Sequence, residues 1–301
     1  MSREPTGLAL YDRTARDAAA AVIAAYSTSF GLACRLLGPR VRPHVRNLYA
    51  LVRIADEVVD GPAAAAGLSA EAELEVLDAL ENEVYAAVGR GFSANLVVHA
   101  FASTARECGI GQDLIRPFFS SMRTDLTRTD HDAASHDAYV YGSAEVVGLM
   151  CLQVFVNAGA RHPAAPAPGL VDGARRLGAA FQDVNFLRDH DHDATGLGRD
   201  YLSLDGTPAS RSAVLDRIDG DLDAAARTIP ALPADCRRAV TLAHDLFAEL
   251  SARLRRESDP GRRVRVPDPV KAAIAARAVA GRPPRPPRSP EGPRTANGAG
   301  R

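Results

Sequence analysis

Apolar residues recur every three to four positions along most of the chain, which is the spacing of one face of an α-helix. Alternating apolar and polar runs, the pattern of a half-buried strand, are scarce, whereas alanine and leucine are frequent. Periodic segments end at stop signals such as Gly38-Pro39 and Gly61-Pro62. The pattern therefore predicts an all-α protein with helices over residues 12–37, 43–60, 69–88, 93–108, 111–124, 135–159, 169–192, 209–228, 233–257 and 267–280.

The helical pattern stops near residue 280. Residues 281–301 are rich in proline and arginine and contain almost no apolar side chain large enough to pack, which is typical of a disordered segment. We expect one all-α domain over residues 8–280 and a disordered tail over 281–301. Weak contact of the arginines with an anionic membrane surface is the alternative to a tail without function.

The amino-acid composition argues against several classes of protein. The 36 basic and 37 acidic residues nearly cancel, which argues against a dedicated nucleic-acid-binding protein. The four cysteines are far apart and form no C-x-x-C pair, so neither a zinc site nor a disulfide framework is expected. The longest apolar stretch, over residues 146–160, is shorter than the roughly 20 residues that a spanning helix needs. We expect a cytoplasmic protein with a buried apolar helix.

The first candidate for chemistry is a pair of aspartates in the helix predicted over residues 43–60. Asp56 and Asp60 are four residues apart, so both carboxylates lie on one helix face, and Arg53 precedes Asp56 on the same side. A single pair of this kind is also typical of a solvated helix surface. A functional interpretation therefore needs a second group of oxygen ligands.

The helix predicted over residues 169–192 and its end provide that group. At about 100° per residue, Gln182, Asn185, Asp189 and Asp193 fall within an arc of about 80°. Carboxylate and amide oxygens favour Mg²⁺ over zinc or copper, with Mn²⁺ as the alternative ion. Arg53 and Arg188 beside the two acidic stripes are suited to hold phosphate oxygens. The combination indicates chemistry on a diphosphate leaving group.

Two histidines inside the second stripe leave another metal chemistry open. His190 and His192 are about 200° apart on a helix, so both face one ion only if the helix ends there. A metallohydrolase that uses zinc or iron at residues 189–193 is the alternative from a different enzyme class. The chain contains no phosphate-binding P-loop, no G-x-S-x-G and no H-E-x-x-H.

Four sequence blocks together resemble the squalene and phytoene synthase family of head-to-head prenyl transferases, most closely its bacterial phytoene synthases. The blocks are STSF at 27–30, residues 49–60, the stretch that begins YVYGSAEVVG at 139, and QDVNFLRDHDHD at 182–193 with GRDYL at 198–202. The likeness extends over nearly all of residues 10–280. It implies an all-α, single-domain isoprenoid-synthase helical bundle around a central cavity.

The resemblance also implies a role for each matching residue. Metal ligands would be Asp56, Asp60, Asn185, Asp189 and Asp193, and Gln182 would belong to the same cluster. Diphosphate would be bound by Arg53 and Arg188, with Ser27, Ser29 and Phe30 at the phosphate mouth. Tyr49 and Tyr141 would lie beside the reacting carbons, with Tyr141 as a catalytic residue.

The implied activity is the Mg²⁺-dependent joining of two geranylgeranyl diphosphates, through a cyclopropylcarbinyl diphosphate, into 15-cis-phytoene for carotenoid biosynthesis. The alternative within the class joins two farnesyl diphosphates into squalene, dehydrosqualene or hydroxysqualene, and only squalene formation would need NADPH. A non-catalytic prenyl-lipid-binding relative is a further alternative, but such a protein would not need the aspartates. Release of so apolar a product implies peripheral contact with the inner face of a membrane.

Overall fold

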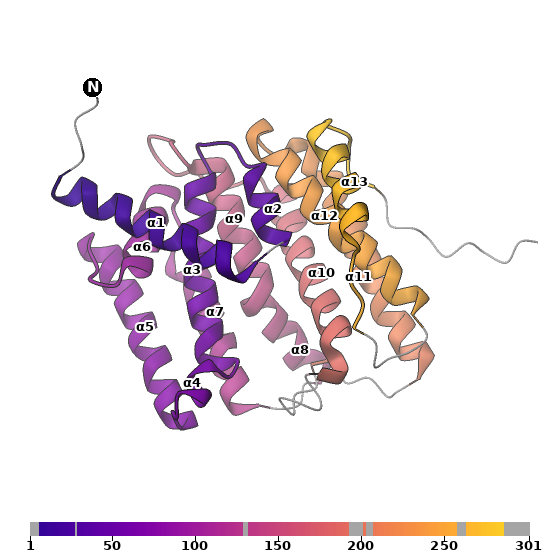
Figure 1. The fold of residues 1–301 in the computed structure, drawn as a ribbon, viewed down its shortest axis with the longest axis horizontal. Coiled ribbons are helices and arrows are strands. Elements are labelled where there is room, and N and C mark those ends of the chain that lie inside the picture. The colour runs from indigo at the N-terminus through magenta and orange to yellow at the C-terminus, as the bar shows by residue number, and fades with distance from the viewer. Residues whose placement is uncertain are drawn as a thin grey trace, which may run out of the picture.

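The computed structural model describes residues 6–27, 29–128, 132–192, 201–202, 207–257 and 263–285. These residues form helices and connecting turns without a strand, as the apolar periodicity predicts. Figure 1 shows the long helices side by side in one bundle, with α5 and α6 at one side and α11 to α13 at the other. The elements are α1 (Leu8–Tyr26), α2 (Ser29–Arg35), α3 (Arg42–Val59), α4 (Pro62–Ala65), α5 (Ala70–Arg90), α6 (Leu96–Cys108), α7 (Gln112–Thr127), α8 (Ala133–Val140), the π-helix η1 (Tyr141–Glu145), α9 (Val146–Asn157), α10 (Pro168–His192), α11 (Pro208–Thr228), the 3₁₀-helix η3 (Ile229–Ala231), α12 (Ala234–Arg256) and α13 (Asp268–Val279).

The single helix expected over residues 12–37 is divided in the structure. Ser27 is extended, with φ −139° and ψ 119°, and ends α1. Its hydroxyl accepts the backbone N–H of Phe30 at 3.1 Å, which satisfies one of the amides that the start of α2 leaves without an intrahelical partner. Hydrophobic periodicity does not detect this break because the apolar spacing continues across it.

The helix expected over residues 135–159 is continuous but irregular, because the π-helix η1 separates α8 from α9. Gly142 in η1 faces α7 at close range. A Cβ atom there would lie 2.1 Å from Oγ of Ser121 and 2.3 Å from the carbonyl oxygen of Pro117. Only glycine therefore permits this approach of the two helices.

The two largest apolar clusters of the described residues form most of the core of the bundle. The larger one contains buried residues of α3, α5, α6, α7 and α9, and the second contains residues of α10 to α13. By length and hydropathy one helical stretch of the described chain, Ala134–Asn157, meets the test for a membrane span, and 44% of that window is buried inside the bundle. Several of its other residues, including Ser143, Val147 and Cys151, line an internal cavity. The helical stretch therefore faces the packed core on one side and the cavity on another, and both faces are largely apolar.

Candidate active site

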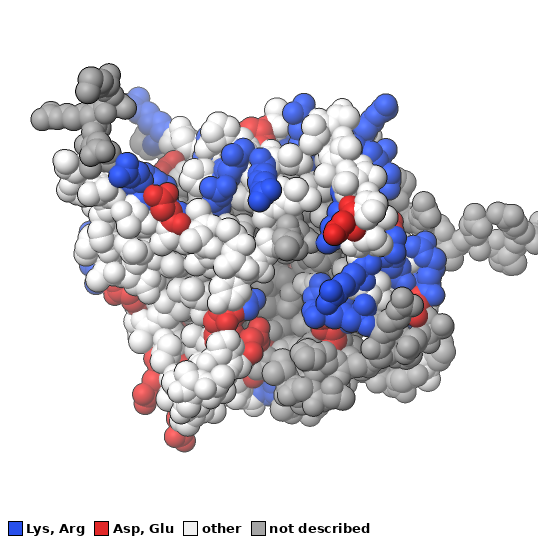
Figure 2. Space-filling model, viewed as in Figure 1, with Lys and Arg blue, Asp and Glu red and all other residues white. Residues whose placement is uncertain are grey.

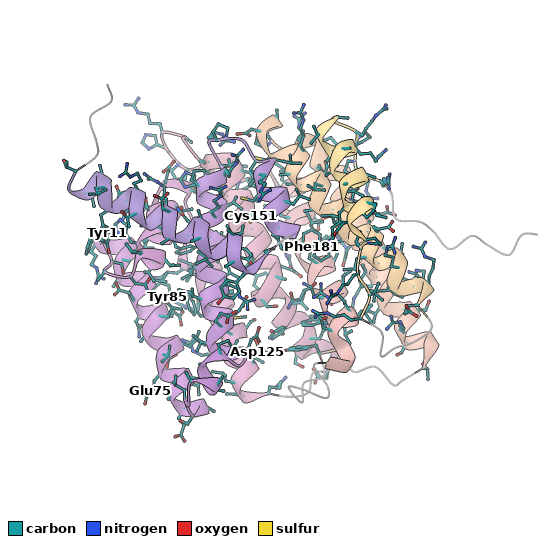
Figure 3. The ribbon with its side chains drawn as sticks, in the orientation of Figure 1. Tyr11, Glu75, Tyr85, Asp125, Cys151 and Phe181 are labelled. Atoms are coloured by element: carbon teal, nitrogen blue, oxygen red, sulfur yellow. The ribbon has the colours of Figure 1, made fainter. Side chains whose placement is uncertain are left out.

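A cavity of about 800 Å³ lies where the two apolar clusters meet, and α2, α3, α7, α9, α10 and α12 contribute to its wall. Its polar end is formed where α3 and α10 end, and its apolar end is formed by their N-terminal halves together with α9 and α12. Figure 3 shows Asp125 toward the lower end of the bundle as drawn, with Cys151 and Phe181 higher up. The cavity therefore combines a charged mouth with a long apolar interior.

The end of α3 brings the first acidic stripe to the cavity as the spacing predicts. Asp56, Asp60 and Arg53 all line it. The Arg53 guanidinium forms an ion pair with Glu57 and lies 4.5 Å from the ring centroid of Tyr26. Among the described residues no acceptor pairs with Nε of Arg53, although this atom is buried. A buried donor of this kind is suited to an anionic ligand.

The end of α10 brings the second stripe to the same cavity. Gln182, Asn185, Arg188 and Asp189 line it opposite α3. The Asp189 carboxylate accepts hydrogen bonds from Nε of the adjacent Arg188 at 3.1 Å and pairs with Nε of Arg263 at 3.0 Å. Helical spacing does not predict Arg263 as a site residue, because it lies 74 positions after Asp189 in a segment without regular secondary structure.

Parts of the predicted cluster lie outside what the structure describes. Asp193 is outside the described residues, as are the side chains of His190 and His192. The same holds for the side chain of Ser29 and for most of the predicted tail, whose described part ends at residue 285.

The acidic end of the cavity carries unfavourable charge. Burial, followed by the negative charge of Asp60, raises the pKa of Asp56 to about 8, whereas Arg53 opposes this increase. Asp125 on α7 adds a further negative charge near Asp56. Carboxylates held together against their mutual repulsion fit a bound cation. Figure 2 shows acidic side chains on the α4 side of this face and basic ones on the α12 side.

The oxygen ligands at the mouth are suited to a magnesium ion that also binds waters and substrate phosphates, rather than to an ion enclosed by protein ligands alone. Within the described ranges, no three His, Cys, Asp or Glu side chains are grouped closely enough to hold a metal ion by themselves. Mg²⁺ is usually held by one or two carboxylates, with waters and substrate phosphates as its other ligands. Asp56 with Asp60 on one wall, and Asp189 with the Asn185 amide on the facing wall, each offer one or two carboxylates for that mode of binding.

The placement of Tyr141 differs from the expected one. Tyr141 does not belong to the cavity wall; it is half-buried, with the Arg175 guanidinium 5.4 Å from its ring centroid. Tyr139 lines the cavity instead, followed at four-residue steps by Ser143, Val147 and Cys151. Position 141 is about 200° away from position 139 around the helix and so lies on another face.

A further residue at the polar end was missed from the sequence. Asp125 is 8% exposed and lines the cavity. Its Oδ2 accepts the hydroxyl of Tyr139 and its Oδ1 accepts the hydroxyl of Tyr201, both at 2.8 Å. The sequence carries a usable signal, because Asp125 occupies the buried face of α7 in register with Phe118 and Met122. A charged residue on an otherwise apolar face indicates a paired or functional group.

The predicted phosphate mouth is only partly in the wall. Phe30 and Tyr49 line the cavity, with ring centroids 6.5 Å apart, and Phe181 lies 6.0 Å from Phe30. Ser27 does not line the cavity; its hydroxyl accepts the backbone N–H of Phe30 at the start of α2. Ser27 therefore supports the mouth through the start of α2, which carries Phe30.

Small and apolar side chains form the interior. Ala144, Gly148, Cys34 and Cys151 line it, together with larger residues at the far end. Burial raises the pKa of the Cys151 thiol to about 12, so the thiol stays protonated and behaves as an apolar wall group. No charged side chain of the described cavity wall lies in this part. The interior is therefore suited to hydrocarbon chains.

Comparisons with known proteins agree with this geometry. A family model described as squalene/phytoene synthase matches residues 23–210. The chain is 29% identical over 244 residues to the phytoene synthase of Arthrospira platensis, covering 78% of this chain and 76% of that protein. It is 28% identical over 276 residues to a 15-cis-phytoene synthase of a Paracoccus species, covering 85% of this chain and 87% of that protein.

Two solved structures share the fold. The crystal structure of a dehydrosqualene synthase in complex with ligand superposes with a TM-score of 0.74 at 21% identity, covering 90% of this chain and 98% of that one. A squalene synthase from Alicyclobacillus acidocaldarius superposes with a TM-score of 0.70 at 19% identity, covering 82% and 95%. The expected isoprenoid-synthase helical bundle is thereby confirmed.

Proposed function

Because the chain belongs to the squalene/phytoene synthase family, and is therefore a prenyltransferase of the head-to-head type, we propose that it joins two geranylgeranyl diphosphates into 15-cis-phytoene. The observation that carries the proposal is the single cavity that joins two acidic stripes at one end to a long apolar interior. The likeness to bacterial phytoene synthases supports this choice of product.

The residues of the charged mouth have two roles in ionisation: some bind the diphosphate and others bind the divalent cation. Arg53, Arg188 and Arg263 bind the diphosphate oxygens and stabilise the charge that develops as the carbon–oxygen bond breaks. Asp56 and Asp60 on one wall and Asn185 and Asp189 on the other would hold the divalent cation, for which we propose Mg²⁺. When bound, this ion neutralises charge on the departing diphosphate.

The apolar interior determines which groups can react with the carbocation. Its walls orient the double bond of the second substrate toward the cationic carbon and exclude water that would trap the cation. Rings of Tyr139 and Phe186 line the cavity beside the mouth and offer electron-rich faces to positive charge. The first condensation releases one diphosphate and one proton and gives a cyclopropylcarbinyl diphosphate. The second ionisation releases the other diphosphate, and the resulting cation rearranges and loses a proton to give the C40 hydrocarbon.

The length of the cavity supports a C20 substrate. Val45 and Asp60 both line it and are fifteen residues apart on α3 and its C-cap. At 1.5 Å per residue, this separation is about 22 Å along the helix axis. An extended geranylgeranyl chain fits that length when its diphosphate lies at Asp60 and its ω-end lies near Val45.

Product analysis tests the proposed function. The purified protein is incubated with Mg²⁺ and either geranylgeranyl or farnesyl diphosphate, with and without NADPH, and the hydrocarbon is identified by mass spectrometry. We expect phytoene from geranylgeranyl diphosphate, with no effect of NADPH. A C30 product from farnesyl diphosphate alone would assign the protein to squalene-type chemistry, and no product from either substrate would favour a non-catalytic prenyl-lipid binder.

Substrate length is expected to respond to the far end of the cavity. Ala239→Phe on α12 adds bulk to that end and should shift the ratio of kcat/KM toward farnesyl diphosphate by about tenfold. Phe155→Ala on α9 removes bulk and should not shift the ratio in that direction. Rates with both substrates measure the effect, and thermal melting shows whether each variant is folded. Equal ratios in the two variants would contradict the proposed position of the chain end.

A further inference from the structure

We propose that Asp125 is a positioning residue for the reaction, because its carboxylate holds the phenols of Tyr139 and Tyr201 in the cavity wall beside the charged mouth. The inference rests on the proposed function and extends it to a residue outside the two acidic stripes. Three elements that are distant in the sequence meet at this carboxylate: α7, α8 and the segment at residues 201–202.

The hydrogen bonds determine where both rings lie. Each carboxylate oxygen accepts one phenol at 2.8 Å, so the two hydroxyls are held on the same small acceptor. The ring centroids of Tyr139 and Tyr201 are consequently 5.1 Å apart. Phe186 on α10 stacks on Tyr201, with centroids 4.2 Å apart and an interplanar angle of 9°. All three rings line the cavity and together form an aromatic wall.

Asp125 is itself held firmly. It is 8% exposed on the buried face of α7, and Ser121 one turn earlier donates a hydrogen bond to the carbonyl oxygen of Tyr139 at 3.1 Å. The close approach of Gly142 to α7 fixes the same junction from the other side. The carboxylate is therefore preorganised rather than recruited when substrate binds.

The hydrogen bonds from the two tyrosines to Asp125 affect how well their rings can stabilise a cation. A phenol that donates to a carboxylate has more electron density in its ring, and cation–π attraction grows with that density. Burial, followed by the charge of Asp125, raises the pKa of Tyr139 well above its usual value, so the phenol stays protonated and continues to donate. The aromatic wall is thus suited to hold a carbocation away from water until it rearranges.

The main test compares product ratios in Asp125→Asn. The amide keeps one acceptor oxygen but presents N–H₂ in place of the other, so one phenol loses its acceptor. We expect the ratio of hydrocarbon to trapped products, which are the cyclopropylcarbinyl diphosphate and prenyl alcohols formed by water addition, to fall about tenfold. KM for the allylic diphosphate should change much less. Tyr139→Phe and Tyr201→Phe should each shift the ratio in the same direction.

Matched controls use a second phenol–carboxylate pair outside the cavity. Tyr85 donates to Glu81 on α5, and Glu81 also pairs with Arg123. Tyr85→Phe removes a comparable hydrogen bond and should leave the product ratio unchanged. An Asp125→Asn variant that lowers all products equally would show a merely structural role. A variant that changes only the Mg²⁺ concentration needed for turnover would show a metal ligand. Either result overturns the proposal.

A binding measurement separates this inference from the proposed function. A prenyl trimethylammonium amphiphile imitates the cation, and its neutral carbon isostere imitates the chain alone. Calorimetry with wild type and the double variant Tyr139→Phe/Tyr201→Phe gives the preference for the cation with no charged residue replaced. We expect that preference to fall about fivefold in the double variant. An unchanged preference overturns the inference even if the wild type makes phytoene, and a fall supports it even if wild type makes another product.

Discussion

Asp56→Asn is expected to reduce turnover at least a hundredfold while the protein remains folded, and Asp189→Asn is expected to do the same. Each substitution removes one carboxylate from a different wall of the charged mouth, so a cation shared with the diphosphate loses a charged ligand. Steady-state rates with geranylgeranyl diphosphate over a range of Mg²⁺ concentrations measure the loss. The asparagine side chain has nearly the same size, so packing is preserved.

The matched control is Asp172→Asn on the same helix as Asp189. Asp172 is exposed and pairs with Arg176 one turn later, away from the cavity wall. Its replacement should change turnover less than twofold, because a surface ion pair contributes little. Near-normal activity of Asp56→Asn would refute the assigned role of this carboxylate.

Asp56→Asn should also stabilise the metal-free protein at high pH. The folded-state pKa of Asp56, about 8, exceeds the ordinary value of 3.8, so ionisation in the folded state costs free energy that the unfolded chain does not incur. Wild-type stability therefore falls as pH rises from about 4 to about 8. Asparagine avoids this cost, so the gain should be absent below pH 4 and largest above pH 8, on the order of 5 kcal/mol. Thermal melts in a chelator at pH 4 and 9 measure it.

Gly142→Ala is expected to destabilise the fold by about 3 kcal/mol or more, with a corresponding fall in Tm. The new Cβ would lie 2.1 Å from Oγ of Ser121 and 2.3 Å from the carbonyl oxygen of Pro117, so α7 and η1 have to separate. The separation also moves Tyr139 relative to Asp125. Chemical denaturation with circular dichroism measures the loss of stability.

A second glycine shows whether the effect comes from the close approach or from glycine chemistry in general. Gly220 lies inside α11 and is exposed, and a Cβ atom at this position would meet no heavy atom of the described chain within 4 Å. Gly220→Ala should stabilise the protein by about 0.5–1 kcal/mol through helix propensity. Equal effects of the two substitutions would show that the contact of η1 with α7 has no special cost.

Local patterns predicted the helices well where burial and propensity agree. The expected helix over 43–60 corresponds to α3, and the one over 209–228 corresponds to α11. Helix boundaries and helix type were predicted less accurately where a side-chain hydrogen bond or a close backbone contact overrode the apolar pattern. Ser27 interrupts the first helix, and the tight contact of Gly142 with α7 coincides with a π-helix that periodicity does not reveal.

The candidate site was predictable to the extent that it follows helical spacing. Asp56 with Asp60, and Asn185 with Asp189, reach the same cavity because residues three or four apart share a helix face. The family motif implies that Tyr141 lies beside the reacting carbons, whereas the cavity wall contains Tyr139 with Ser143, four residues apart on the helix. Arg263 and Asp125 were missed because their partners are far away in the sequence.

The sequence by itself determined the all-α class, the two acidic stripes and the family, since these depend on residue types at short spacings. Only the tertiary structure decided that both stripes meet at one end of an apolar cavity, and that Asp125 gathers two tyrosines from different segments. The physical reason is that helix periodicity is a local property. Which helix faces which depends on how the two apolar clusters pack against each other, and that packing sums many weak contacts between residues distant in the chain.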